Sequence, residues 1–515
     1  MDLFLENNDY HYELEKLCRL FYPMQRIRVF EKGAAPADPD PMCITARFRD
    51  GTASVTFQTP QGTSVSESPC EDASDAERTL AVLLWRFLQK ESGFTPQWGI
   101  LTGIRPVKLL RRLAERFGEA EAAGRLLEDY LVSPQKVALA RETLHNESAV
   151  LSKEKENGCS VYVGIPFCPT RCAYCSFVST TVEKTMRLIP AYLDCLCREI
   201  AAAGAVAKDL GLSVQSVYIG GGTPTTLSAS QLSRLLAAIR CAFDLSACLE
   251  YTVEAGRPDT VTREKLQVLH ENGVTRVSIN PQTMHDDVLE AIGRRHTTAQ
   301  TLAAFALARE AGFQNINMDL IAGLPRDTYE GFCDSVRQVL ALSPESVTVH
   351  TLALKRASRI YQEHEEKAAR LSGAVATDML RFADQTLLAE GFLPYYLYRQ
   401  SRILGGLENV GFAKPGNENF YNTVIMDESQ TILACGAGAG TKVVAPDGSG
   451  RLKRVFNFKY PYEYIHRHEE VLARKEQVRE LYAAFCRQPV FPYTQRRAGD
   501  QRPGRKGAGH PDRPQ

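Results

Sequence analysis

Three cysteines, Cys168, Cys172 and Cys175, lie within eight residues in the spacing C-x3-C-x2-C. Thiolates on one short loop can converge on a single inorganic centre. A structural zinc ion takes four protein ligands, but neither a second C-x2-C pair nor a histidine pair lies nearby. A 4Fe–4S cluster held by three thiolates keeps one iron open, which is a catalytic feature. The triplet therefore predicts an iron–sulfur centre, with a zinc-stabilised interaction protein as the alternative.

The chain has 14 cysteines, and most of the others stand alone in the sequence. Cys159 precedes a predicted strand, so we expect it at the opposite end of that strand from the triplet. Disulfides are not expected in a long chain without a signal peptide. Eight isolated cysteines are therefore interpreted as small buried hydrophobic residues: Cys18, Cys43, Cys70, Cys241, Cys248, Cys333, Cys435 and Cys486.

Length and composition limit the class of protein. The 515 residues are 44% hydrophobic and 24% charged, which predicts a globular chain of two to four domains. With 61 basic and 61 acidic residues the formal net charge is zero, so we expect neither nucleic acid nor an anionic membrane as a partner. No apolar run reaches 18 residues, and Met1 to Glu6 do not form a signal peptide. The expected location is the cytoplasm.

Strands and helices alternate after Ser160. Amphipathic helical stretches separate six short strand candidates, a pattern typical of a parallel sheet with right-handed crossovers. Six units are too few for a closed eight-fold barrel, so an open or partial barrel is expected, with its chemistry at the C-terminal strand ends. The strand candidates are 160–165, 216–219, 250–254, 276–279, 315–321 and 346–350, and the helices are 192–206, 229–243, 262–272, 298–311 and 329–342.

The rest of the chain divides into three further predicted regions. Residues 1–155 form an N-terminal α+β domain of unknown role, with a hairpin around Asp50-Gly51 and a polar linker over 146–157. A C-terminal α+β extension, 356–486, follows the barrel (156–355) and contains a long helix and a tyrosine-rich strand at 395–398. Residues 487–515 are rich in Arg, Pro, Gly and Gln, and are interpreted as a disordered or non-native tail rather than a nucleic-acid-binding arm.

Further residues with chemical potential follow these strands. Gly220-Gly221-Gly222-Thr223-Pro224-Thr225 comes directly after a strand, where glycines let the backbone approach a ligand closely. Glu254 ends the third strand and Gln282 follows the fourth. Asp319 stands between apolar neighbours in the fifth strand, where an unpaired buried carboxylate would be costly. A ligand hydroxyl or amine is a sensible partner for it.

These motifs resemble those of the radical S-adenosylmethionine (SAM) superfamily, and in particular its oxygen-independent coproporphyrinogen III oxidase group. The resemblance rests on Tyr162 to Phe177, on Gly220 to Thr225 and on Asn317-Met318-Asp319-Leu320-Ile321-Ala322-Gly323-Leu324-Pro325. Gly103-Ile104-Arg105-Pro106 and Asn409 to Gly416 are similar to the HemZ branch, the coproporphyrinogen dehydrogenases. The resemblance implies an α/β fold, a partial (β/α)6 radical SAM barrel flanked by the N-terminal domain and the C-terminal extension.

The resemblance also implies the cofactors, a 4Fe–4S cluster on the three cysteines and SAM chelated to its open iron. Reduction of the cluster would cleave a carbon–sulfur bond of SAM and yield a 5′-deoxyadenosyl radical. No catalytic residue is implied beyond the cluster-bound cofactor. Matching positions place the SAM contacts at Tyr162, Gly221, Gly222, Thr223, Glu254, Gln282, Arg294 and Asp319, with Ala353 as a weaker backbone contact.

The implied reaction is the oxidative decarboxylation of two coproporphyrinogen III propionates to vinyl groups, giving protoporphyrinogen IX for haem biosynthesis. The implied partners are this porphyrinogen substrate and a flavodoxin- or ferredoxin-like electron donor. A tetracarboxylate needs cationic anchors and aromatic walls. Candidate anchors follow the last strand or flank the tyrosine-rich strand: Lys355, Arg356, Arg359, Arg399 and Arg402.

A haem-binding chaperone of the same superfamily is the alternative function. That branch shows an HNxxYW stretch, whereas the comparable segment here, Gly416 to Asn422, lacks both the His and the Trp. The segment therefore favours the enzyme. The chain departs from the characterised oxidases at Phe177, where they carry a further cysteine, and in its longer N-terminal region.

Overall fold

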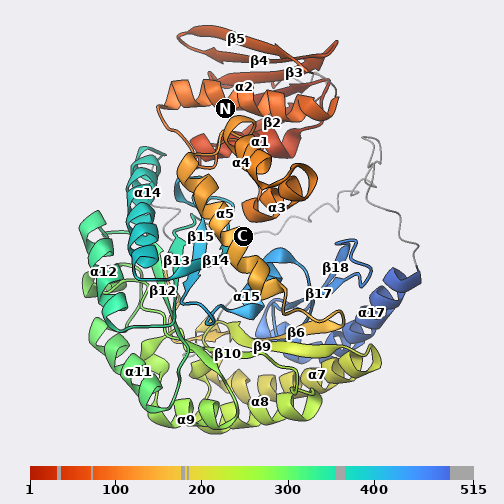
Figure 1. Cartoon of the computed structure of the whole chain (residues 1–515), viewed down its shortest axis with the longest axis vertical. Helices are drawn as coiled ribbons and strands as arrows, with labels where there is room; N and C mark the ends of the chain where they lie inside the picture. The colour runs from red at the N-terminus through yellow and green to blue at the C-terminus, as the bar shows by residue number, and fades with distance from the viewer. Residues whose placement is uncertain (32–35, 71–72, 176–179, 182–184, 355–365, 488–515) are drawn as a thin grey trace.

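The computed structural model describes residues 1–31, 36–70, 73–175, 180–181, 185–354 and 366–487. Its centre is an 11-stranded sheet in the order β14-β15-β13-β12-β11-β10-β9-β6-β16-β17-β18 (Figure 1). The six predicted strands are confirmed as consecutive parallel neighbours. They are β6 (Gly158–Ile165), β9 (Ser213–Gly221), β10 (Glu250–Glu254), β11 (Arg276–Ser278), β12 (Ile316–Ala322) and β13 (Ser346–Thr351).

Helices cover the outer face of these parallel strands, as Figure 1 shows along the curved lower rim of the molecule. Side-chain caps fix where several of them begin, because Ser228 and Thr297 each form a capping box with the glutamine three residues later. The five predicted helices are confirmed, and a short α10 (Asp286–Ala291) is added. They are α7 (Ile189–Asp209), α8 (Ala229–Ala242), α9 (Arg263–Glu271), α11 (Thr298–Glu310) and α12 (Tyr329–Ala341).

The C-terminal part of the chain extends this sheet at both edges. β16 (Thr431–Cys435) pairs in parallel with β6, and β17 (Gly440–Val444) and β18 (Leu452–Phe456) follow as antiparallel strands. At the other edge, β15 (Asn409–Ala413) pairs antiparallel with β13, and β14 (Leu393–Tyr398) pairs antiparallel with β15. The strand order is linear, so the sheet is an open, partial barrel as predicted.

Four helices of the C-terminal part lie around the extended sheet. The long predicted helix is α14 (Glu366–Ala389), and α15 (Phe420–Asp427) follows β15. α16 (Pro461–His466) and α17 (His468–Arg487) close the chain beside α7. No helix of the described residues combines the length and apolarity needed to cross a membrane.

The first hundred residues form a separate layer at the top of Figure 1. Their sheet has the order β2-β1-β3-β4-β5, and the predicted hairpin is confirmed by the antiparallel pairing of β3 with β4. Helices α1 and α2 pack on this sheet around a core of residues from Met1 to Ile100. The elements are β1 (Asp2–Glu6), α1 (His11–Phe21), β2 (Arg28–Glu31), β3 (Cys43–Arg49), β4 (Thr52–Thr59), β5 (Gly62–Pro69) and α2 (Ala73–Ser92).

Three further helices join that layer to the barrel: α3 (Pro106–Phe117), α4 (Glu119–Glu128) and α5 (Pro134–Leu151). Their apolar residues share the barrel's hydrophobic core. α5 crosses the open side of the sheet in Figure 1 and packs on β14. The predicted linker over 146–157 is wrong in its first half, because α5 continues to Leu151. The predicted domain limits stay predictions, although the packing places residues 98–140 with the barrel.

Candidate active site

A cavity of about 370 Å³ opens at the C-terminal ends of the parallel strands. It brings together most of the site residues expected from the sequence, from six strands or the loops that follow them. The expected residues that line it are Cys168, Cys172, Cys175, Gly221, Gly222, Thr223, Glu254, Gln282, Arg294, Asp319 and Ala353. This end of the sheet is where chemistry is expected in a parallel α/β fold.

The cysteine loop is fastened to the loops beside it. The amide of Ala173 donates to the carbonyl of Ile292 at 2.9 Å, and the Thr170 hydroxyl donates to the carbonyl of Gly293 at 3.1 Å. Arg257 donates to Thr170 Oγ1 at 2.9 Å and pairs through two nitrogens with Asp259. These contacts fix the loop whose three cysteines line the cavity. Cys159 is buried near the start of β6, away from the triplet, as expected.

The glycine run packs directly against the cysteine strand. The amides of Gly222 and Thr223 each donate at 2.8 Å, to the carbonyls of Ile165 and Phe167. A Cβ on Gly222 would lie 2.7 Å from the Phe167 oxygen and 3.0 Å from Cys168 Sγ, so no side chain fits there. Thr223 Oγ1 donates to that sulfur at 3.5 Å. The backbone of the glycine run therefore lies directly against the Cys168 sulfur, and we call this surface of Gly221, Gly222 and Thr223 the glycine cradle.

Glu254 is a buried carboxyl group on the cavity floor. Burial raises its pKa to about 7, although the hydrogen bond from Tyr218 at 2.6 Å and one from the Gly221 amide lower it. The site above Gly220 is equally tight, since a Cβ there would lie 2.9 Å from the Glu254 carboxyl. Glu254 can therefore accept from a bound amine near neutral pH.

Asp319 is a second buried carboxyl group, and its pKa is shifted down, whereas that of Glu254 is shifted up. Burial opposes its charge, but hydrogen bonds from His350, Asn317 and Thr348 and the charge of His350 hold its pKa below the usual value. Asn317 Nδ2 lies 2.7 Å from Oδ1, and His350 Nε2 lies 3.6 Å from Oδ2. Asp319 thus stays ionised where Glu254 titrates, and the cavity holds two carboxyl groups of different character.

Arg294 and Gln282 also line the cavity. Arg294 donates to the carbonyls of Asn280 at 2.8 Å and Gly256 at 3.1 Å. Burial opposes its charge, but Tyr174 and Cys172 beside it raise its pKa above the usual value. Gln282 adopts a positive φ of 71° and exchanges backbone hydrogen bonds with Asp319 and Ile321. This strained turn places the Gln282 side chain at the cavity rather than in a regular strand.

Tyrosines contribute more than the sequence indicated. Tyr162 does not line the cavity, but its hydroxyl lies 3.3 Å from the Cβ position of Gly221. Its ring stacks on Tyr218 and Tyr421, and those two rings lie 4.6 Å apart. Tyr218, His350, Tyr396 and Tyr398 line the cavity and were missed. Tyr218 pairs with Tyr162 in the neighbouring strand β6, so both side chains point to the same face of the sheet. The alternation of side chains along the two strands could have predicted Tyr218 from Tyr162.

Neither Arg399 nor Arg402, the two predicted substrate anchors within the described residues, lines the cavity. Lys355, Arg356 and Arg359 lie outside the described residues. The expectation for Arg399 is wrong, because its guanidinium is buried and donates to the backbone carbonyls of Leu101, Gly103 and Gly406. Arg402 is not among the cavity-lining residues, although its carbonyl accepts from the Leu354 amide. Arg399 joins segments of the fold instead of facing the cavity.

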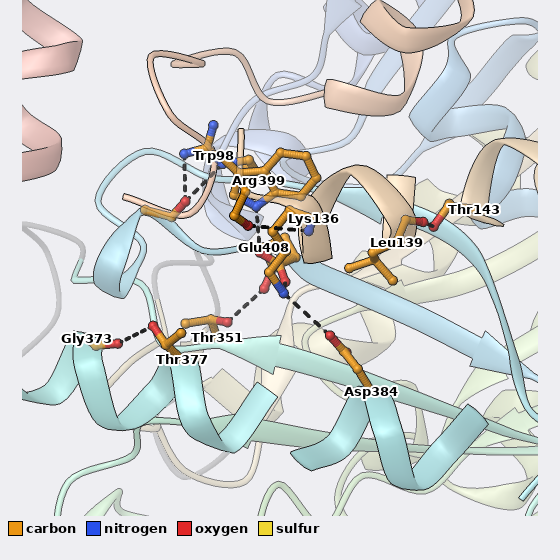
Figure 2. A network of polar contacts seen from close by, with 12 residues as sticks. Trp98, Lys136, Leu139, Thr143, Thr351, Gly373, Thr377, Asp384, Arg399 and Glu408 are labelled. Carbon is orange, nitrogen blue, oxygen red and sulfur yellow. Dashed lines mark hydrogen bonds and ion pairs between the residues drawn. The ribbon is translucent and has the colours of Figure 1, made fainter. Parts of the chain in front are cut away.

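Beside Arg399, a buried ion-pair network links the N-terminal helices to the edge of the cavity (Figure 2). Glu408 accepts from Trp98 Nε1 at 2.7 Å and from Lys136 Nζ, which also lies 3.4 Å from Asp384. The carbonyl of Glu408 accepts from Thr351, and the next residue, Asn409, accepts from the Thr351 amide at 3.0 Å. Thr351 and Asn409 both line the cavity, so the network supports that wall.

The isolated cysteines are only partly as expected. None of the 14 forms a disulfide in the described chain, and Cys18, Cys333 and Cys435 are buried. Cys241 and Cys486 are exposed, and Cys43, Cys70 and Cys248 are half-buried, so their interpretation as buried hydrophobic residues was wrong. Their helical or strand-end positions face outward, which a single residue type does not reveal.

Residues 162–339 match the radical SAM superfamily, and this match defines the class of the protein. The chain is 37% identical over 481 residues to the oxygen-independent coproporphyrinogen-III oxidase-like protein HemZ of Bacillus subtilis, covering 90% of this chain and 94% of the relative. The chain therefore belongs to the HemZ family of oxygen-independent coproporphyrinogen-III oxidase-like proteins.

Two other relatives are more distant. The haem chaperone HemW of Bacillus subtilis is 31% identical over 328 residues, which cover 62% of this chain and 81% of that protein. Among solved structures, coproporphyrinogen III oxidase (HemN) from Escherichia coli has a TM-score of 0.49 and 24% identity, covering 62% of this chain and 71% of that chain.

Proteins of the radical SAM superfamily use a 4Fe–4S cluster and SAM, and these are the cofactors of this family. The residues of the cavity fit both. Three thiolates and a glycine cradle meet at its mouth, and within the described chain Asn280 Oδ1 and Arg294 Nε are buried there without a hydrogen-bond partner. No three metal-binding side chains of the described residues gather around a single-ion site. A cluster does not require this, because each thiolate binds a different iron.

Proposed function

We propose that this protein is an oxygen-independent coproporphyrinogen III dehydrogenase. It would convert two propionate side chains of coproporphyrinogen III to vinyl groups, giving protoporphyrinogen IX for haem biosynthesis. The observation that carries the proposal is the meeting of the cysteine triplet, the glycine cradle and two buried carboxyl groups in one cavity of a HemZ-family chain.

The residues of the cavity have separable roles in this proposal. Cys168, Cys172 and Cys175 would hold the cluster. When bound, the cluster and SAM supply reductive cleavage of a carbon–sulfur bond and the hydrogen-atom abstraction that follows. Glu254 would accept from the methionyl amine of SAM, and Asp319 from its hydroxyl groups. Gly221, Gly222 and Thr223 would let the backbone approach the methionyl group, with Tyr162, Gln282 and Arg294 completing the shell and excluding water.

The substrate would lie against the tyrosine-rich wall. Tyr396, Tyr398 and Gln400 line the cavity from β14 and its following turn, and Asn409 and Asn422 add amide groups. Such a surface suits an apolar macrocycle with polar edges. Lys355 and Arg356, which directly follow Leu354, and Arg402, whose carbonyl holds the Leu354 amide, remain the proposed propionate anchors.

An anaerobic assay tests the proposal directly. The reconstituted protein is incubated with coproporphyrinogen III, SAM and a reductant, and the oxidised products are separated by chromatography. We expect protoporphyrin, with 5′-deoxyadenosine and methionine formed in step with it. Formation of 5′-deoxyadenosine without any decarboxylated porphyrin would refute the substrate assignment while leaving the radical SAM chemistry intact.

A haem-binding chaperone is the second candidate, because HemW relatives match 62% of the chain at 31% identity. The segment that would carry the chaperone's histidine, Gly416 to Asn422, has no histidine. In the fold it caps α15 and inserts Tyr421 against Tyr218, and Asn419 and Asn422 line the cavity. A stoichiometric Soret band on haem titration, together with no decarboxylation, would favour the chaperone.

The proposal also includes the cell compartment and the electron source. An oxygen-sensitive cluster needs a reducing interior, so the cytoplasm is the proposed location. The proposed electron donor is a flavodoxin- or ferredoxin-like protein.

A further inference from the structure

Large aromatic side chains are exposed where β18 leads into α16. Phe456, Tyr460 and Tyr462 are 62%, 42% and 53% exposed, and the rings of Tyr460 and Tyr462 stack with their centroids 6.0 Å apart. We call Phe456, Lys459, Tyr460, Tyr462 and Arg467 the α16 patch. A gathering of exposed aromatic rings with basic residues is typical of a protein–protein contact.

The α16 patch lies at the same end of the sheet as the cysteine loop. β16 runs parallel to β6, with Cys435 opposite Val163. β17 returns from that end, and its first residue, Gly440, pairs with Phe456 at the end of β18. Because Ile432 pairs with Lys442, Phe456 is level with Tyr162, three residues before β6 ends at Ile165. The end of β18 therefore lies near the end of β6, which Phe167 and Cys168 follow.

Packed aromatic rings span the interior between the patch and Cys168. The ring of Phe167 meets Tyr192 edge-on at 5.2 Å, and Tyr192 lies 5.1 Å from Tyr464. The Tyr464 amide donates to the carbonyl of Tyr460 at 3.0 Å, one helical turn away in the patch. Phe167, Tyr192 and Tyr464 are fully buried. These rings form a continuous packed route from the surface to a cluster ligand.

The route is held rigidly by one buried carboxylate. Glu199 accepts from Tyr464 Oη at 2.5 Å, from the Gly436 amide at 2.8 Å and from Asn457 Nδ2 at 2.7 Å. Lys475 Nζ, also buried, lies 2.6 Å from the same carboxylate. Tyr192 Oη donates to the Gly164 carbonyl at 2.7 Å. These hydrogen bonds fix the positions of the Tyr192 and Tyr464 rings.

The charge of the surface indicates the kind of partner. From Arg451 to Arg467 the sequence has five Arg or Lys residues and one acid, Glu463. Three of the five pair with acids nearby, Arg451 with Asp447, Arg454 with Glu428 and Arg467 with Glu470, so the exposed Lys453 and Lys459 carry the charge that is open to a partner. Arg467 lies over the Phe458 ring at 4.1 Å, as does Arg474 at 4.0 Å. Lys459 is exposed, and no ion pair joins it to another of the described residues. A basic surface attracts an acidic protein and speeds its encounter.

We propose that the α16 patch is the docking surface for an acidic one-electron carrier protein that reduces the cluster. The inference rests on the cluster assigned under the proposed function. One electron leaves the reduced carrier and is gained by the oxidised cluster, and no bond or proton is exchanged. Because tunnelling falls steeply with distance, a carrier must dock close to the cluster. Small contacts of this kind are typical of redox encounters.

Stopped-flow spectroscopy on the anaerobic, cluster-loaded protein tests this surface without any porphyrin. Reduced flavodoxin is the donor, and bleaching of the cluster absorbance is the readout. For Tyr460→Ala/Tyr462→Ala and for Lys459→Glu we expect the second-order rate constant to fall at least about tenfold, with a weaker salt dependence for Lys459→Glu. Reduction by dithionite should keep its wild-type rate.

Matched controls lie on the N-terminal layer, where Tyr12 is 60% exposed and Lys90 is exposed. Tyr12→Ala and Lys90→Glu should leave both rates unchanged. Wild-type rates with flavodoxin in the patch variants would overturn the docking surface. Equal slowing with dithionite would overturn it too, since the residues would then support the cluster itself. Failure to form protoporphyrin affects neither readout, so the two proposals fail separately.

Discussion

Tyr218 Oη donates a hydrogen bond of 2.6 Å to Oε1 of Glu254 across the neighbouring strands β9 and β10. Burial raises the pKa of that carboxyl group to about 7, and the Tyr218 hydrogen bond restrains the rise. Glu254 thus titrates in the range in which the protein is expected to work, and the Tyr218 hydrogen bond is the largest of the contacts that favour its ionised form.

Tyr218→Phe should weaken SAM binding and shift its pH dependence upward. The ionised carboxylate is the stronger acceptor for the N–H groups of the methionyl amine, so affinity in the wild-type protein should rise with pH through about 7 and then level off. A hydrogen bond to a charged group contributes about 1.5–3 kcal/mol, and one pKa unit is about 1.4 kcal/mol, so the midpoint should rise by about one unit or more. Calorimetric titration of the cluster-loaded protein from about pH 6 to about pH 9, a range that includes both expected midpoints, measures this. If the midpoint of the SAM affinity did not shift in Tyr218→Phe, ionisation of Glu254 would not control SAM binding.

Substitution of any triplet cysteine should abolish the cluster. Cys168→Ala, Cys172→Ala and Cys175→Ala each remove one thiolate, and anaerobic preparations should lose the brown colour and the content of about four irons per chain. Cys241→Ala is the matched control, because Cys241 is exposed on α8 and far from the triplet in sequence. Zinc without iron in the wild-type protein would contradict the assignment.

Gly222→Ala should disturb the cluster and the fold together. The new methyl group would meet two backbone oxygens, of Phe167 and Ile165, and the Cys168 sulfur at 2.7–3.0 Å. Since backbone cannot yield cheaply, we expect a loss of about 1–3 kcal/mol in unfolding free energy and poor cluster reconstitution. Gly124→Ala on α4 meets nothing within 4 Å and should be neutral or stabilising by up to about 1 kcal/mol. Urea unfolding and iron content are the measurements.

Lys136→Met should destabilise the protein strongly, because Glu408, with 0% exposure, would keep a buried charge without its cation. Loss of one partner of a buried pair costs about 3–5 kcal/mol. Adding Glu408→Gln should restore part of the loss, as the amide still accepts from Trp98 Nε1. Arg263→Gln, which breaks the exposed pair with Glu310, should cost less than about 1 kcal/mol. Similar urea midpoints for Lys136→Met and Arg263→Gln would contradict this account of the network.

The alternation of strands and helices predicted the barrel well. The parallel strands are short apolar runs, and the helices α8, α9, α11 and α12 that follow four of them begin at a Ser or Thr cap, so both signals are local. β16 was missed, because its partner β6 is some 270 residues away and nothing local marks a strand that completes a distant sheet. Motif spacing found the cysteines, glycines and carboxyl groups. Motif spacing could not show that the Arg399 guanidinium donates to backbone carbonyl groups inside the fold. Nor could it show that Tyr218 lies against Glu254 and His350 against Asp319, since these contacts depend on tertiary packing.

The position of α5 across the open side of the barrel has a consequence for the order of folding. The layer of residues 1–100 has its own core and can fold as soon as it leaves the ribosome. α5 is synthesised soon afterwards, but its partner β14 emerges only after the six parallel strands β6 to β13. The part of α5 that packs on β14 therefore stays without its partner until β14 has been synthesised. The contact of α5 with β14 thus joins segments that lie more than about 240 residues apart in the sequence, which is typical of a slowly folding, non-local topology.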